Sequence, residues 1–327
     1  MPAELATDPG SRQASRRVVL LGPQRLRPTL CDAVRDEGLD PTAPIAAVTA
    51  GWEEREAEDA ELSDHLGGPV INLRVFERAE DVYRRDPELH VAMRARHDLL
   101  RELQGLYHVR LHHSLDAARD LLAQAGNPRL LEPEREGAIA AVRALDRAHL
   151  QRVRELHDEF EAEWRLGERD AVVSARRAVA TDLGAAQALC VAGGHVAILL
   201  NRMRVLDVLS LAGDRPIFAW SAGAMALGAQ VVLFHDRPAQ GPGDAEVLVH
   251  GLGAFQGVLP LPHASRRLRL KDPRRVELLA RRFAPDRCMA LDEGCDLRWD
   301  GETWRAASSE TRELTVAGAV EERREGR

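Results

Sequence analysis

The sequence predicts an α/β fold, a doubly wound and largely parallel sheet with a long helical hairpin inserted into it. Short apolar segments alternate with amphipathic ones near both ends of the chain, as βαβ units do. Between them, residues 79–169 carry almost no strand signal and are rich in Arg, Glu, Leu, Ala and His. We therefore predict one α/β domain from residues 17–78 and 170–316, with 79–169 as a helical insertion.

The first α/β part contains three apolar runs, each bounded by glycine or proline, which we predict to be strands. They are RRVVLLGP (16–23), APIAAVTAGW (43–52) and GPVINLRVF (68–76). The segments between them, LRPTLCDAVRDEGL and EEREAEDAELSDHL, suit helices. Residues 1–16 are small and polar, which predicts a disordered arm.

The insertion has two series of apolar residues at roughly helical spacing. They are Leu99, Leu103, Leu106, Leu111, Leu115, Ala118 and Leu122, and then Ile139, Val142, Leu145, Val153, Leu156 and Phe160. Gly126 and Pro128 separate them, which predicts two long antiparallel helices. Such long amphipathic faces favour a homo-oligomer interface; a lid or a partner-docking arm is the alternative.

The second α/β part resumes at about residue 170. Its predicted strands end at the Gly193-Gly194 pair or lie in PIFAW, QVVLFHD, GVLPLPH and CMALDEG. LRWDGETWRA is typical of a hairpin that turns at Asp300-Gly301. Residues 317–327 are predicted to be a charged tail.

Composition narrows the class of protein. The 327 residues carry a net charge of −7, which argues against nucleic acid or an anionic membrane as a partner. No apolar run approaches the roughly 18 residues of a membrane span, and no apolar signal core is present. None of the four cysteines forms a CxxC pair, which disfavours zinc and thiol-redox sites. We expect a cytoplasmic protein.

The stretch RPIFAWSAGAMALGAQ (215–230) places Ser221 between an apolar strand and a helix of small residues. A serine nucleophile on a sharp turn has the usual pattern G-x-S-x-G, and here Ala219 replaces the first glycine. The helix N-terminus behind it would supply N–H groups to an oxyanion. The alternative is an ordinary serine N-cap.

Two glycines, Gly193 and Gly194, end the strand in VAGGHVAILLNRM. Glycine lets the backbone approach a ligand closely, so Gly194 or its neighbour is a candidate second oxyanion donor. A tight strand-to-helix turn explains the same pair without a function.

A nucleophilic serine needs a base. His263 ends an apolar strand in PLPHASRR, the position at which parallel sheets present active groups. His235 in LFHDRP is the rival, and His250 and His195 are further candidates.

Four ordered segments, CVAGGHVAILL, PIFAWSAGAMAL, GLGAFQGVLPLPHASRR and MALDEGCDLRWDG, together resemble the S51 serine peptidase family. This is the group of α-aspartyl dipeptidase and cyanophycinase. The resemblance covers residues 170–305 and extends to RVVLLGP and AVTAGWEERE. It implies a fold similar to that of class I glutamine amidotransferases. The family pattern contains no counterpart of the helical insertion.

The resemblance implies that Ser221 is the nucleophile and His263 the base. Asp236 stands at the matching place for the acid that orients the imidazole, and Glu246 in GDAEVL is the second choice, because cyanophycinase-like members use a glutamate. The backbone N–H groups of Gly194 and Ala222 would form the oxyanion hole. No metal and no organic cofactor are implied.

Three departures from the family pattern favour an alternative function. Ala219 replaces the elbow glycine, His195 stands where Asn is common, and the insertion is able to cover the site. A non-catalytic member that binds a ligand or partner through the helical insertion is therefore the rival. A glutaminase of the amidotransferase class would need cysteine in place of Ser221.

The family members named above act on aspartyl peptides, so the resemblance implies a small acidic or aspartyl peptide or amide as substrate. Arg266 and Arg267 follow His263 and are candidates to bind its carboxylate, although arginine runs are usually solvated. Trp52, at a strand end, and His195 are further candidate contacts.

The insertion is rich in histidine. His108 and His112 share a helix face, and Asp146-x-x-His149 resembles half of a carboxylate-bundle metal site. Too few inward carboxylates accompany them, so we predict solvated or core histidines.

Overall fold

The computed structural model describes residues 16–236 and 243–323. The predicted arm (1–16) lies almost entirely outside these residues, as do 324–327 of the predicted tail. None of the helices among the described residues is both long enough and apolar enough to cross a membrane.

A seven-stranded sheet forms the centre of the body, in the order β11-β10-β1-β5-β4-β2-β3. The five parallel strands are β1 (Val18–Leu21), β5 (Ile217–Trp220), β4 (Ala188–Val191), β2 (Ile45–Val48) and β3 (Val70–Asn72). Two antiparallel strands, β10 (Asp296–Trp299) and β11 (Trp304–Ala306), complete one edge. The predicted α/β fold with a largely parallel sheet is confirmed.

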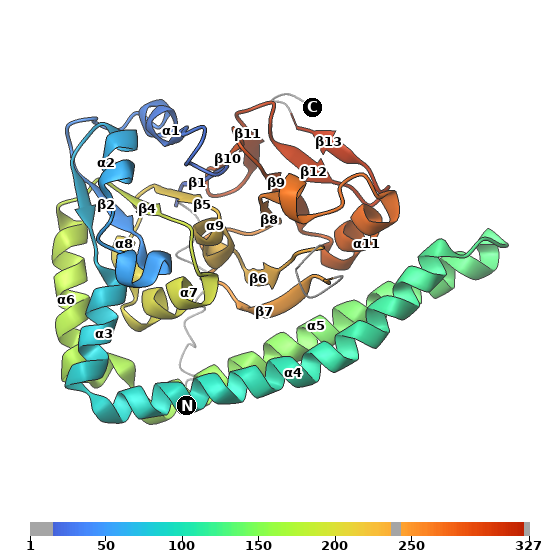
Figure 1. The fold of residues 1–327 in the computed structure, drawn as a ribbon, viewed down its shortest axis with the longest axis horizontal. Coiled ribbons are helices and arrows are strands. Elements are labelled where there is room, and N and C mark those ends of the chain that lie inside the picture. The colour runs from blue at the N-terminus through green and yellow to red at the C-terminus, as the bar shows by residue number, and fades with distance from the viewer. Residues whose placement is uncertain (1–15, 237–242, 324–327) are drawn as a thin grey trace, which may run out of the picture.

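Helices cover both faces of this sheet (Figure 1). Successive residues of a buried strand point to opposite faces, and accordingly Val19 and Leu21 pack with α1 (Leu30–Asp36) and α2 (Ala60–Leu66). Val18 and Leu20 belong to the larger core on the other face. The helices on that side are α3 (Val75–Arg85), α6 (Asp170–Gly184), α7 (Val196–Val205) and α8 (Val208–Ala212).

Three of the predicted strands do not join this sheet. β8 (Val258–Pro262) and β9 (Arg287–Leu291) pair in parallel within a second, four-stranded sheet. β6 (Gln230–Leu233) and β7 (Glu246–His250) form a separate antiparallel ribbon.

The second sheet is completed by the C-terminal part of the chain. β12 (Arg312–Leu314) and β13 (Val320–Glu322) pair antiparallel beside β9, and α11 (Pro273–Phe283) packs against β9 and β12. Residues 320–322 therefore form an edge strand, a correction to the predicted charged tail that began at 317.

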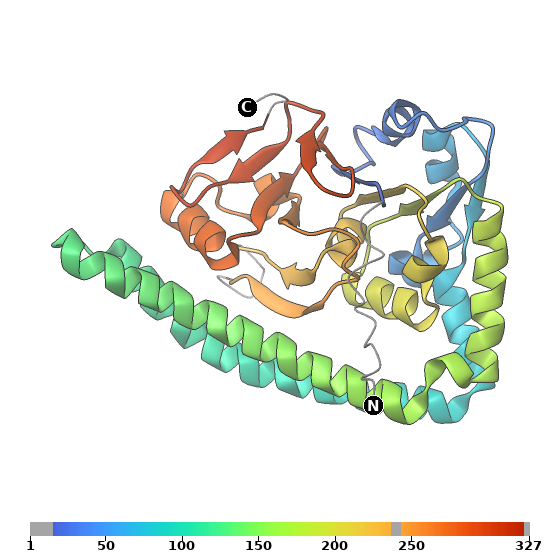
Figure 2. The ribbon, with the colours of Figure 1, turned by 180° about the vertical axis from the view of Figure 1, so that it is seen from behind.

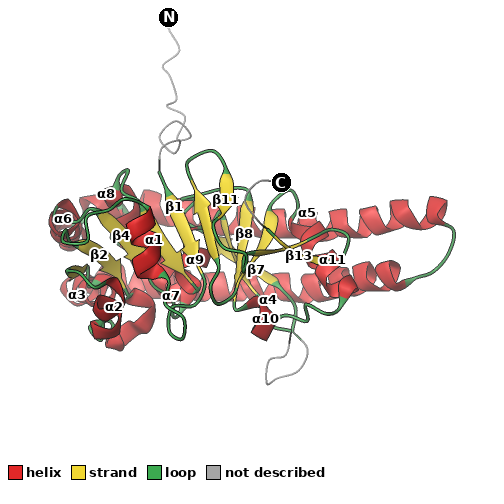
Figure 3. Cartoon of the chain, turned by 90° about the horizontal axis from the view of Figure 1, so that it is seen from above, coloured by secondary structure: helices red, strands yellow, loops and turns green. Residues whose placement is uncertain are grey.

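The insertion forms two helices, α4 (Pro87–Ala123) and α5 (Pro128–Trp164), of 37 residues each. Asp86 and Asn127 cap them, since each side chain accepts a backbone N–H of the first turn and a proline follows. Figures 1 and 2 show the hairpin running along one side of the body, and its tip projects past α11, as Figure 3 also shows. The predicted boundary at 79 falls inside α3, which packs on the body.

Only part of the predicted apolar face of the insertion is buried. Leu103, Leu111 and Leu115 lie in the core, whereas Leu99 is 52% exposed and Leu106 58% exposed. The inward face of α4 also includes Tyr107, whose hydroxyl is polar. Tyr107 was not part of the predicted apolar series.

A buried charge cluster joins the hairpin to the body. Arg282 of α11 binds Asp146 of α5, with its Nε 2.7 Å from Oδ2 and its Nη2 2.8 Å from Oδ1. Tyr107 donates to Asp146 at 2.7 Å and accepts from Arg282 at 2.9 Å. Burial raises the pKa of Tyr107, which keeps the phenol protonated. The Asp146–His149 pair is thus part of a structural contact: His149 donates from Nε2 to Leu248 O and stacks on Tyr107.

Candidate active site

The turn between β5 and α9 (Ala222–Leu227) holds Ser221 in a strained conformation, φ 51° and ψ −125°. A residue other than glycine in such a region costs about 1–3 kcal/mol, so the surrounding packing must impose it. The packing comes from glycine: a Cβ on Gly193 would lie 2.8 Å from Ser221 Cβ, and one on Gly223 2.2 Å from Val191 O. A side chain larger than glycine at Gly193 or Gly223 would therefore clash with the turn that holds Ser221. Ala219, which replaces the usual glycine, is fully buried in β5.

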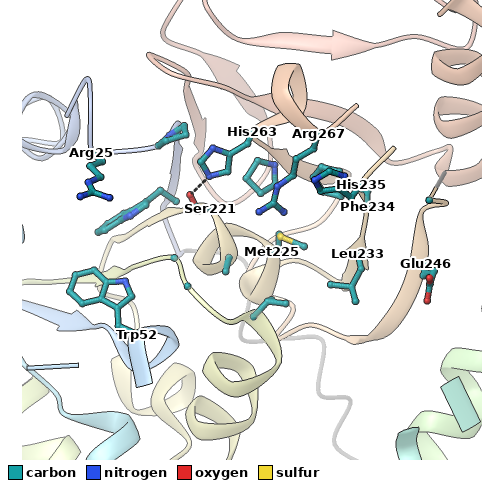
Figure 4. A pocket seen from close by; sticks show the side chains of 18 of the residues that line it. Arg25, Trp52, Ser221, Met225, Leu233, Phe234, His235, Glu246, His263 and Arg267 are labelled. Atoms are coloured by element: carbon teal, nitrogen blue, oxygen red, sulfur yellow. Dashed lines mark hydrogen bonds between the residues drawn. The ribbon is translucent and has the colours of Figure 1, made fainter. Parts of the chain in front are cut away.

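His263 faces the serine from the end of β8, immediately before α10 (Ala264–Arg267). Its Nε2 is 3.1 Å from Ser221 Oγ (Figure 4). The backbone of His263 has a positive φ of 57°, and its N–H donates to Leu291 O at the end of β9. The histidine therefore lies at the end of a strand of the second sheet, and the serine at the end of a strand of the first sheet.

The surroundings of His263 favour the neutral imidazole. Burial lowers its pKa, and the neighbouring Arg267 guanidinium lowers it further. The carboxylates of Asp292 and Glu293 act in the opposite direction, and Arg266 makes a smaller contribution to the lowering. A neutral histidine beside a hydroxyl is able to accept its proton.

The two predicted oxyanion donors border this turn. Among the described residues, no acceptor binds the backbone N–H of Gly194 or Ala222. Gly194 has a φ of 113°, and a Cβ there would lie 2.2 Å from Gly51 O, so the position admits only glycine. Ala222 begins α9 directly after the serine.

The structure does not bring either predicted acid to His263. Asp236 binds Arg275 (Oδ1 to Nη2, 2.5 Å) and accepts the backbone N–H of Arg269. Glu246 lies at the start of β7 and binds His108 of α4, far along the cleft from His263 (Figure 4). Both are corrections. Glu246 begins β7, which packs on the hairpin, whereas Asp236 follows β6 with its N–H bound to Arg267 O, and Arg275 and Arg269 engage its carboxylate.

Two carboxylates that raise the pKa of His263, those of Asp292 and Glu293, follow β9 in the DEG segment. Asp292 accepts from the N–H and Oγ of Ser265 and binds Arg312 at 2.5 Å. Glu293 is exposed and forms no hydrogen bond with any described residue. We did not assign these residues from the sequence, although MALDEG was one of the four family-like segments.

A cleft of about 1290 Å³ surrounds the Ser221–His263 pair. Trp52 and Arg267 line it as predicted, and so does His235. Arg266 is exposed and is not part of the lining, and His195 instead caps α7, accepting the backbone N–H of Ile198 through Nδ1. His250 lies at the far end of β7.

One wall of the cleft comes from the hairpin, which the sequence already placed near the site as a possible cover, although no residue of it was assigned to the lining. His108, His112 and His113 of α4 line it, and Arg25 lines the opposite side (Figure 4). Among the described residues, no group of three or more His, Cys, Asp or Glu is placed to hold a metal ion.

One comparison with known proteins, the scan against family models, agrees with the resemblance of the motifs. The family model of peptidase family S51 matches residues 139–307, which include Ser221 and His263. A solved structure, the crystal structure of a peptidase from an acI-B1 Actinobacterium, is 14% identical, with 95% of this chain and 98% of that chain covered at a TM-score of 0.46. No curated protein matches the chain. Because the family model covers more than half of its residues, the chain belongs to peptidase family S51.

Proposed function

We propose that the protein is a serine hydrolase that cleaves small acidic or aspartyl peptides through an acyl-enzyme. The observation that carries this proposal is the strained Ser221, whose Oγ lies 3.1 Å from His263 Nε2. A hydroxyl held on a sharp turn within hydrogen-bond reach of a neutral histidine is the arrangement of an activated nucleophile.

In the proposed reaction, Ser221 Oγ attacks the amide carbonyl carbon while its proton passes to His263 Nε2. The N–H groups of Gly194 and Ala222 stabilise the negative oxygen of the tetrahedral intermediate. His263 then protonates the departing amine and leaves an ester on Ser221. Water, deprotonated by His263, hydrolyses this ester and restores the serine.

The pH dependence should follow the lowered pKa of His263. A base works in its neutral form, so we expect the acid limb of the kcat/KM profile on an aspartyl p-nitroanilide below pH 6.5, about the ordinary pKa of histidine. Arg267→Gln removes a charge that lowers this pKa, so the limb should move to higher pH. The exposed Arg269→Gln should leave it in place. A wild-type limb above pH 6.5, or one that Arg267→Gln does not move, would contradict the proposal.

We propose Glu293 as the acid that completes the triad. Asp292 is already bound to Ser265 and Arg312, whereas Glu293 is free of such contacts among the described residues and lies close enough to affect the pKa of His263. Glu293→Gln is expected to lower kcat by about a hundred- to ten-thousand-fold. Asp292→Asn should act mainly on stability, since it breaks the Arg312 contact. Equal kcat for Glu293→Gln and wild type would exclude Glu293.

The lining of the cleft supports an acidic substrate. Arg267 is half-buried beside Ser221, with its guanidinium 5.9 Å from the Phe234 ring centroid, and Arg25 lines the same cleft. Guanidinium groups bind carboxylates through paired hydrogen bonds. We propose that Arg267 holds the substrate carboxylate, with Trp52 on the opposing wall. Arg266, exposed and outside the lining, is not part of this proposal.

Covalent labelling with a fluorophosphonate, read by mass spectrometry of peptides, tests the proposed function. We expect one modified peptide carrying Ser221, and a rate of labelling reduced by a hundredfold or more in His263→Ala. The exposed Ser174 serves as an internal control that stays unmodified. A folded protein that is not labelled at Ser221 would refute the proposal.

One observation favours the non-catalytic alternative: among the described residues, no carboxylate is hydrogen-bonded to His263 Nδ1. Under that alternative the cleft binds an acidic ligand and releases it unchanged. Aspartyl peptides would then bind to the wild type, measured by calorimetry, but would not be cleaved over days.

Association of two or more copies through the hairpin stays a prediction. Four exposed apolar side chains on α4, Val91, Leu99, Leu106 and Val109, support it. The cytoplasmic location and the similarity of the wrapping to class I glutamine amidotransferases also stay predictions.

A further inference from the structure

A second cavity, of about 950 Å³, lies between the hairpin and α7. The β6–β7 ribbon separates it from the cleft: Leu233 and Glu246 line the cleft at one end of the ribbon, and Ala229 and His250 line the cavity at the other. None of the residues proposed above for catalysis lines the second cavity. It is therefore a separate place on the molecule.

The charged side chains around this cavity are predominantly positive. Among the described residues that line it are five arginines and three carboxylates, an excess of two positive charges that falls to one when Asp98, which pairs with Arg101 at 3.8 Å from outside the lining, is counted. The arginines are Arg96, Arg101, Arg154, Arg176 and Arg204, and the carboxylates are Asp158, Glu161 and Asp207. We call this site the arginine cavity.

Three of these arginines, Arg96, Arg176 and Arg204, are half-buried, and none forms an ion pair with a carboxylate of the described residues. Arg282 and Arg202, by contrast, bind Asp146 and Glu80. Arg143 and Arg215 are also half-buried without a carboxylate among the described residues, but they donate to backbone oxygens and line neither this cavity nor the cleft. Removing a charge from water without a partner is costly, so unpaired cations that line a cavity favour an anion within it.

Two of the guanidinium groups are held in position by the protein itself. Arg204 donates to the backbone oxygens of His250 and Gly251, which fixes it at the end of the ribbon. Arg96 lies 4.1 Å above the centroid of the Phe160 ring, which orients its plane. A preorganised guanidinium loses less conformational entropy when it binds an oxyanion.

Two histidines that line the cavity, His157 and His250, do not add to its charge at neutral pH, because burial lowers the pKa of each. Burial lowers the pKa of His157 to about 3, and Arg204 and Arg96 contribute to this shift. Arg204 itself stays charged, because burial and Arg96 lower its pKa only to about 10. The excess charge therefore belongs to the arginines.

We propose that the arginine cavity binds a small ligand that carries a doubly charged oxyanion group, a phosphate or a pair of carboxylates. Three half-buried guanidinium groups without a carboxylate partner suit a ligand group with two negative charges, and planar guanidinium groups pair with both kinds of oxyanion. This proposal does not depend on the proposed peptidase mechanism.

Isothermal titration calorimetry of the full chain with inorganic phosphate and, separately, with succinate tests it at constant ionic strength. We expect saturable binding of at least one of the two, and the tighter one identifies the class. Arg204→Gln and Arg96→Gln should each weaken it by about ten- to a hundredfold, the usual effect of removing a charge-assisted hydrogen bond. Arg94→Gln is the matched control, because Arg94 lies on α4 like Arg96 but is exposed and does not line the cavity.

Arg267→Gln in the cleft distinguishes the two sites. If binding is lost in Arg267→Gln but kept in Arg204→Gln, the anion occupies the cleft and the proposal is wrong. Absence of saturable binding, or equal loss in Arg204→Gln and Arg94→Gln, would also overturn it. Circular dichroism of each variant establishes that the fold is retained, and Arg204→Lys, which keeps the charge, should restore part of the affinity if Arg204→Gln is unstable.

Discussion

Replacing Ser221 with alanine is expected to lower kcat on an aspartyl peptide by about four to six orders of magnitude. The change removes the atom that lies 3.1 Å from His263 Nε2 and that forms the proposed acyl-enzyme. Since the side chain shrinks by one atom at a strained turn, stability should not fall. Hydrolysis measured by liquid chromatography, with thermal unfolding on the same samples, separates the two effects.

The double variant Ser221→Ala, His263→Ala gives a sharper result. Groups that act as one unit are strongly non-additive, so the second change should cost little once the first is made. Ser174→Ala, on the exposed surface of α6, is the matched control and should keep the wild-type rate. If Ser221→Ala retains activity within tenfold of the wild type, another residue is the nucleophile.

Replacing Arg282 with methionine is expected to lower the free energy of unfolding by about 3–5 kcal/mol, because Asp146 is then left buried without its cation. Arg282 also donates to Ala245 O at 2.6 Å, so the same change weakens the contact between α11 and the β6–β7 ribbon. Urea unfolding followed by circular dichroism measures the loss.

The neighbouring ion pair provides the control. Arg281 binds Glu136, which is 67% exposed, at 2.8 Å and Glu277 at 2.9 Å, and both pairs remain in contact with water, so Arg281→Gln should cost about 1 kcal/mol. Adding Asp146→Leu to Arg282→Met removes the unpaired charge and should recover part of the loss. A single Arg282→Met variant as stable as Arg281→Gln would show that the cluster does not hold the hairpin.

The serine and histidine were predictable because their signals are local. A serine between an apolar strand and a run of small residues, and a histidine at the end of an apolar strand, depend on a few neighbours in sequence. The family model supports the resemblance of these segments. Their strained backbones, with positive φ at both Ser221 and His263, follow from contacts with Gly193 and with β9 that are distant in sequence.

The acid was not predictable in the same way. Asp236 lies near the elbow in sequence, but Arg275, 39 residues further on, holds its carboxylate elsewhere. The second sheet, in which β9 lies beside β8, brings the DEG segment toward His263. Strand order of this kind is a long-range property that periodicity does not contain.

The hairpin illustrates the same limit. Helical spacing predicted two helices but not which side of α4 faces inward, and Leu99 and Leu106 are exposed as a result. The inward side is decided by Tyr107 and Asp146, whose burial depends on Arg282, 136 residues beyond Asp146. Buried polar residues of this kind weaken the apolar periodicity of the sequence at the positions where the helices pack on the body.

The two ends of the hairpin meet at its base, where Arg169 binds Asp86. The helices that precede and follow them, α3 and α6, pack against each other on the body. A shorter ancestor or relative is therefore able to connect α3 to α6 directly, with Ser221 and His263 left where they are. Loss of this one segment would remove the histidine-lined wall of the cleft and the arginine cavity together, and its gain would add both. Insertion at this point would therefore add one wall to the cleft and a second cavity to the molecule while Ser221 and His263 keep their places.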